Sequence, residues 1–170
     1  MAPDEGASTP TEARLVSGPA LRGDAGPRLL RFLLEHGADE FSITVMALQD
    51  TQAPFADAFE DELGPHELTP ARRPVLARAG GTATDRVIRR WRYTRETLDR
   101  LLGFLDTDIV HCPAGPDGWL EDLVVYRRGG IVLGIVSHEQ EGVLRLTAAE
   151  LAEVAALGIT FEVALNEAGD

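Results

Sequence analysis

The sequence predicts an α+β domain built on a mostly antiparallel sheet, with several helices packed on that sheet. The first observation is a run of three short strand patterns within residues 120–146 that turn back on one another and lead straight into a helix. The second is that helix and strand patterns occupy separate segments along the rest of the chain, with no internal repeat.

The chain of 170 residues is expected to fold as a single domain over residues 26–165. Residues 1–25 are rich in Pro, Gly, Ala, Ser and Thr without periodicity, which predicts a disordered tail, and residues 166–170 are expected to fray. No apolar run approaches the roughly 20 residues of a membrane helix, and the start lacks the layout of a signal peptide. We therefore expect a cytoplasmic protein.

The first half of the domain is expected to alternate helices and strands. Pro27 suits a first helical position and Gly37 suits a helix end, with leucines between them at helical spacing. Phe41, Ile43 and Val45 alternate with smaller or polar residues, as in a strand. The predicted elements are a helix at 27–37, a strand at 40–49, a helix at 53–64, strands at 73–79 and 85–93, and a helix at 95–105 capped by Thr94.

The second half contains the three-stranded meander. Strands at 120–127 and 130–138 are expected to join through a two-residue turn at Arg128-Gly129, which places Val125 opposite Val132. The second of these strands is apolar on both faces, so we expect it to be central in the sheet.

A second bend, at residues 140–142, is expected to use the glycine Gly142 and to place His138 opposite Leu144. Thr147 and Glu150 have the spacing of a capping box for the helix that follows, and Gly158 suits its end. Two further strands are predicted, at 108–112 and 159–165.

The charge of the chain is strongly negative and unevenly distributed. The net charge is −12, and every cation is an arginine, which is typical of a GC-rich genome. Residues 32–71 contain acids but no arginine, residues 72–100 are rich in arginine, and the remainder is again acidic. Two interpretations are open: the blocks neutralise each other in the fold, or they form separate surfaces.

A surface of this charge favours a protein partner with a basic surface. Many bacterial immunity proteins, which neutralise toxins, share this general profile, as do secretion chaperones. The first hypothesis is therefore a non-enzymatic, acidic protein-binding module that neutralises or chaperones a basic partner. The residues predicted to bind the partner are Asp57, Glu60, Asp61, Glu62, Trp119 and Glu121.

The strand at 85–93 supports a different hypothesis, in which arginines beside aromatic residues hold phosphate or single-stranded nucleic acid. The alternative is that these arginines pair with acids of the same chain, and the net negative charge argues against nucleic acid. The candidate phosphate-binding residues are Arg86, Arg89, Arg90 and Arg92.

A third hypothesis is a small enzyme that uses His138 with Glu139 or Glu141, or uses Cys112. Successive strand residues point to opposite faces, so we expect His138 and Glu139 to diverge. Cys112 is the single cysteine, which excludes an internal disulfide, and it is surrounded by acids, which disfavours a thiolate. No phosphate loop, nucleophile elbow or metal-binding spacing is present, so we expect no cofactor and no metal.

Overall fold

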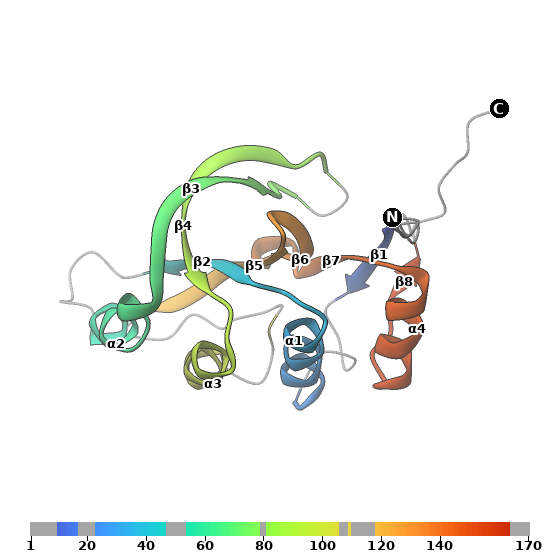
Figure 1. The fold of residues 1–170 in the computed structure, drawn as a ribbon, viewed down its shortest axis with the longest axis horizontal. Helices are drawn as coiled ribbons and strands as arrows, with labels where there is room; N and C mark the ends of the chain where they lie inside the picture. Colours follow the sequence, from blue (N-terminus) through green and yellow to red (C-terminus); the bar gives the residue numbers. More distant parts are fainter. Residues whose placement is uncertain are drawn as a thin grey trace, which may run out of the picture.

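The computed structural model describes residues 10–16, 23–46, 54–78, 81–105, 109 and 118–163. Within these residues, an antiparallel sheet of eight strands has four helices along one of its faces (Figure 1). The strand order is β3-β4-β2-β5-β6-β7-β1-β8. The predicted α+β fold with a mostly antiparallel sheet is confirmed.

The elements follow the predicted order, with one strand added at the start. The first half comprises β1 (Thr11–Val16), α1 (Ala25–Glu35), β2 (Glu40–Met46), α2 (Pro54–Leu63), β3 (Glu67–Val75), β4 (Thr84–Arg92) and α3 (Arg95–Phe104). The second half comprises β5 (Trp119–Arg127), β6 (Gly130–Val136), β7 (Glu141–Leu146), α4 (Ala148–Ala156) and β8 (Glu162–Val163). Of the strand predicted at 108–112, only Ile109 lies within the described residues, and it is buried.

Strand β1 lies inside the range that the sequence assigns to a disordered tail. It pairs with β7 along its whole length and also with β8. Its composition gives little strand signal, but Ala13 and Leu15 are fully buried against the sheet. Tertiary contacts therefore stabilise this strand more than its local propensity does.

Strand β3 begins earlier than the predicted strand at 73–79. It contains Pro70 and Pro74, which cannot donate to a strand ladder, and it is the outermost strand of its side of the sheet. Proline is tolerated at such an edge because the missing N–H faces away from the neighbouring strand.

The first turn of the meander matches the prediction, but its register does not hold along the strand. Arg128 and Gly129 have φ of 52° and 79°, as a two-residue turn of type I′ requires, and Arg127 pairs with Gly130. A register shift then follows Tyr126, so that Val125 pairs with Leu133 rather than with Val132. Strand β6 is central and buried along nearly its whole length, as expected.

The second bend differs from the prediction. A short 3-10 turn at Ser137–Glu139 ends at Gln140, which takes the left-handed conformation with φ of 54°, while Gly142 lies within β7. Leu144 therefore pairs with Leu133, and the predicted pairing of His138 with Leu144 is wrong. The bend is built from residues that precede the expected glycine, because Gly142 is packed against Leu15 and Ile135.

The helix after the meander is capped as the sequence predicts. The Thr147 hydroxyl accepts from the Glu150 N–H, and the Glu150 carboxylate accepts from the Thr147 N–H. Gly158 follows the helix with φ of 80°. Helix α3 has an analogous reciprocal cap between Thr94 and Thr97.

The two faces of the sheet carry separate apolar clusters. The larger one lies between the sheet and the helices and includes Leu29, Leu33, Phe59, Trp91 and Leu101. The smaller one lies on the opposite face, beneath the β3–β4 hairpin, and includes Leu76, Val124, Tyr126, Ile131, Val136 and Val143. In Figure 1 this hairpin rises from the sheet and curls over the side that has no helices. We call the described residues of this hairpin, 67–78 and 81–92, the arch.

Candidate binding cleft

The sheet splits between β2 and β4, and a cleft opens at the split. Strand β4 pairs with β2 only at Trp91↔Phe41 and Arg92↔Glu40, whereas its pairing with β3 continues to Thr84. The arch therefore leaves the plane of the sheet beyond Trp91 (Figure 1). The cleft has a volume of about 430 Å³, within the range of protein ligand pockets.

The cleft is bounded by the edges of two strands rather than by their faces. The four consecutive residues Ser42–Val45 of β2 all line it. On β4, the neighbours Ile88 and Arg89 both line it as well. A strand face contributes only every second residue, so a lining of consecutive residues indicates an exposed backbone edge. Within the described part of the chain, no strand pairs with Ser42–Met46 on this side.

Side chains hold the arch above the sheet. Leu76 packs directly on Gly134, where an added Cβ would approach the leucine Cδ1 to 2.5 Å. The Tyr126 hydroxyl donates to the Pro74 carbonyl at 3.0 Å. Because Gly134 has no side chain, there is room for Leu76 to pack on the sheet, and this contact holds the arch close to β6.

An ionic contact at the base of the arch adds to this attachment. The Glu40 carboxylate accepts from Arg73 at 2.9 and 3.0 Å and also from Arg90, and all three side chains are partly buried. Burial opposes ionisation of Glu40, but the hydrogen bonds from the two arginines outweigh it and hold the pKa of Glu40 below its ordinary value. The Glu40 carboxylate thus joins β2 to both strands of the arch.

A β-bulge shapes the floor of the cleft. The β2–β5 register shifts between Ser42 and Thr44, and Asp122 opposite this shift has φ of 53°. The Asp122 N–H donates to the Ser137 hydroxyl at 2.8 Å, and the Asp122 carboxylate accepts from the Ser137 N–H at 2.9 Å. These reciprocal bonds stabilise a left-handed conformation that aspartate tolerates better than most residues.

The rest of the lining combines apolar side chains with the charged side chains of Arg86, Arg89 and Asp122. Leu76, Ile88 and Val124 form the apolar part. Trp91 also lines the cleft; it is 1% exposed, and its indole N–H has no acceptor within the described residues. Such unsatisfied buried donors are uncommon in folded proteins.

The candidate phosphate-binding arginines divide into two kinds. Arg89 is held by Glu60 and Glu67 at 2.6 to 3.0 Å and lies over the Trp91 ring, and Arg90 is held by Glu40. These hydrogen bonds raise the pKa of Arg89, and the bond from Arg89 lowers the pKa of Glu67.

Arg86 and Arg92 are the exposed members of that predicted set, and neither has a carboxylate partner among the residues that the structure describes. The acidic and arginine blocks of the sequence therefore neutralise each other only in part. Of the four candidates, Arg86 and Arg89 line the cleft.

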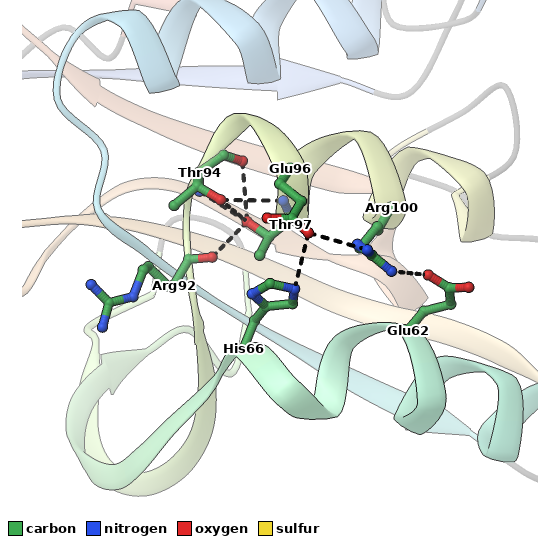
Figure 2. A network of polar contacts seen from close by, with 7 residues as sticks. All are labelled: Glu62, His66, Arg92, Thr94, Glu96, Thr97 and Arg100. Carbon is green, nitrogen blue, oxygen red and sulfur yellow. Dashed lines mark hydrogen bonds and ion pairs between the residues drawn. The ribbon is translucent and has the colours of Figure 1, made fainter.

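The predicted acidic surface of α2 is divided in the same way. Glu60 binds Arg89, and Glu62 binds Arg100, which also binds Glu96 at 3.1 Å; Figure 2 shows the latter network with His66 beside Glu96. Asp57 and Asp61 are exposed and have no cationic partner in the described part of the chain. Two of the four predicted carboxylates on this helix thus remain available.

Trp119 and Glu121 are joined to each other rather than to α2. The Trp119 indole N–H donates to the Glu121 carboxylate at 2.7 Å. Trp119 pairs with Met46 and Glu121 with Thr44, and the intervening Leu120 is buried in the helix-side core. Alternation therefore places Trp119 and Glu121 on the arch side of the sheet, next to the cleft.

The histidine bend does not assemble the predicted catalytic group. His138 lies in the 3-10 turn with its side chain 64% exposed, and its Nε2 is 3.9 Å from the Glu139 carboxylate, so the two side chains approach each other instead of diverging. Glu141 is bound by Arg14 from β1. Cys112 lies outside the described residues. Within those residues, no group of three His, Cys, Asp or Glu side chains could hold a metal ion.

Sequence reasoning missed the residues that create the cleft, among them Ser42, Thr44, Leu76 and Asp122. Only the lack of charge and of proline in the β2 segment Ser42–Met46 gave a local signal, since such an edge is usually paired. The split itself depends on where β4 leaves β2, which no local pattern encodes.

No protein-family model matches this chain, and neither the curated proteins nor the solved structures contain a significant match to it. None of the helices in the described ranges is long and apolar enough to cross a membrane.

Proposed function

We propose that this protein is a non-enzymatic binding module whose ligand is another protein. The observation that carries this proposal is the open backbone edge of Ser42–Val45 along the cleft. An extended segment of a partner can add to such an edge as a further strand, because its main chain supplies the missing hydrogen bonds and its side chains enter the flanking pockets.

The two outer edges of the sheet, β3 and β8, differ from the open edge of β2 in a way that supports the same proposal. Strand β3 carries Pro70 and Pro74, and β8 at the other end spans Glu162–Val163 in the part of the chain that the structure describes. Proline, short length and charge are common means of preventing unwanted strand pairing. The open edge of β2 has none of these features, although it contains the β-branched residues Ile43, Thr44 and Val45.

The net charge of −12 supports attraction to a partner whose overall surface is basic, with Asp57 and Asp61 among the available carboxylates. Neutralisation of a toxin or chaperoning of a secreted protein are the forms of binding that this profile suggests. Cytoplasmic location likewise stays a prediction from the sequence.

The test is co-purification of the tagged full-length chain from its native cells, followed by direct binding of the recombinant partner. Thr44→Trp places a large side chain in the cleft and is expected to abolish binding, because Thr44 is exposed there. Thr69→Trp, at an exposed position of β3, is the matched control and is expected to retain it. Absence of any stoichiometric partner, or equal binding by both variants, would contradict the proposal.

A further inference from the structure

The arch is basic although the protein as a whole is acidic. Among the described residues, it contains four arginines that have no carboxylate partner. Of its two acids, Glu67 binds Arg89, and Asp85 has no cationic partner there. The four arginines are Arg72, Arg78, Arg86 and Arg92. The arch thus differs in charge from the protein as a whole.

Within the cleft itself, the available positive charge is that of Arg86. Arg89 is neutralised by two carboxylates, whereas the Asp122 carboxylate keeps its negative charge, accepts from the Ser137 N–H and lies on β5, across β2 from the arch. Charges separated by more than about 8 Å are largely screened at physiological ionic strength, so a bound segment responds to the charges that line the cleft more than to those elsewhere on the surface. Local complementarity therefore favours an anionic group beside Arg86.

The open edge sets the shape of what binds. Ser42–Met46 spans about 17 Å of extended chain, enough to pair with a short strand. Leu76 and Ile88 of the arch, together with Val124 of β5, offer apolar contacts beside this edge. Side chains of an added strand alternate between two directions, so apolar residues on one side can pack on these side chains while polar ones remain outside.

We infer that the cleft takes an extended, acidic segment of the partner protein, which adds as a strand to β2 with a carboxylate at Arg86. This inference rests on the proposed function, since it names the part of the partner that binds. It also separates two roles of charge: the acidic surface attracts a basic partner as a whole, and the basic arch selects an acidic segment within it.

The experiment selects peptides from a displayed library of random dodecapeptides on the full-length protein and, in parallel, on two charge-reversed variants. Arg86→Glu changes the cleft, and Arg95→Glu makes the same charge change at an exposed position of α3, outside the cleft. We expect wild type and Arg95→Glu to enrich acidic, proline-free peptides with alternating apolar residues. Arg86→Glu is expected to lose affinity for those peptides by at least tenfold and to enrich basic ones.

Strand addition is tested on the selected peptides themselves. Hydrogen exchange of the backbone amides in Ser42–Met46 is expected to slow when peptide is bound, and N-methylation of alternate peptide amides on the pairing edge is expected to abolish binding. Strand addition would be refuted by a peptide that still binds whichever set of alternate amides is N-methylated. It would also be refuted if hydrogen exchange of the β2 amides did not change when peptide is bound.

The other outcomes are distinct. Enrichment of basic peptides by wild type, no enrichment at all, or equal behaviour of the Arg86 and Arg95 variants would overturn the inference. Competition for the cleft by a single-stranded oligonucleotide would also overturn the inference and would indicate that nucleic acid binds there. Each of these results leaves the proposed function standing if a protein partner still co-purifies, whereas failure of co-purification removes the function as well.

Discussion

The meander β5–β6–β7 and the arch β3–β4 are both antiparallel ribbons of one sheet, but different contacts attach them to it. Strand β5 pairs with β2 from Tyr126 to Trp119, and β7 pairs with β1 along its whole length. The arch has only two paired positions with β2, at Phe41 and Glu40. Backbone pairing fixes the meander, whereas side chains fix the arch.

This difference explains how β2, an interior strand of the sheet, can have an unpaired edge. A continuous backbone ladder would have closed the gap between β2 and β4. Instead, side-chain contacts hold the arch in place: two at its base, from Trp91 and Glu40, and two over the opposite face of the sheet, from Tyr126 and Leu76. The arch can therefore be loosened by single side-chain changes that leave the meander paired.

The largest effect is expected from Trp91→Ala. The indole stacks on Phe41 at 5.5 Å and meets Phe59 edge-on at 5.5 Å, at the point where the arch joins the core. Loss of a buried aromatic of this size lowers the free energy of unfolding by about 3–5 kcal/mol. Urea denaturation measures this value. A loss below about 1 kcal/mol would mean that the arch does not depend on this contact.

Glu40→Gln is expected to follow, with a loss of about 2–3 kcal/mol, because it leaves Arg73 and Arg90 partly buried without their carboxylate. Hydrogen exchange should accelerate in β3 and β4 and stay slow in β6. Glu67→Gln, which removes a carboxylate from an exposed arginine at the arch, is the control with a smaller expected loss. Equal acceleration in β6 would show that arch and meander unfold together.

The third prediction concerns Glu150→Gln, on the meander side, with a loss of about 1.5 kcal/mol at neutral pH. The hydrogen bond from Arg127, together with those at Thr147, lowers the pKa of Glu150 to about 2. A depressed pKa stabilises the fold above the unfolded value near 4.5, and this stabilisation disappears as the pH falls towards 2. The difference between wild type and variant should shrink over that range, as measured by denaturation at several pH values.

The same division separates what the sequence predicted from what it could not. The meander, the capping box at Thr147 and the central position of β6 depend on local patterns: alternation, a two-residue turn and a three-residue spacing. The second bend was mispredicted because tertiary packing of Gly142 against Leu15 outweighed the turn preference of glycine. Strand β1 was missed for the same reason.

The cleft could not be predicted from local sequence patterns, because it depends entirely on tertiary contacts. Its residues come from β2, β4, β5 and the end of β3, and its width depends on Leu76 resting on Gly134. The arginine strand could be singled out as a candidate surface from its composition. The sequence could not show which of these arginines lack a carboxylate partner, because Glu40, Glu60 and Glu67 approach the arginines only after folding.

The smallest effect is expected from Tyr126→Phe. This change removes the hydroxyl that donates to Pro74 at 3.0 Å and lies 3.2 Å from the Ser42 hydroxyl, while the buried ring is kept. One such hydrogen bond contributes about 1 kcal/mol, so global stability should fall only slightly. Because the bond joins the sheet to the arch directly, exchange of the β3 amides near Pro74 should accelerate more than any amide of β7. If β7 accelerates equally, the arch is not an independently attached element, and the open edge of β2 must be stabilised in another way.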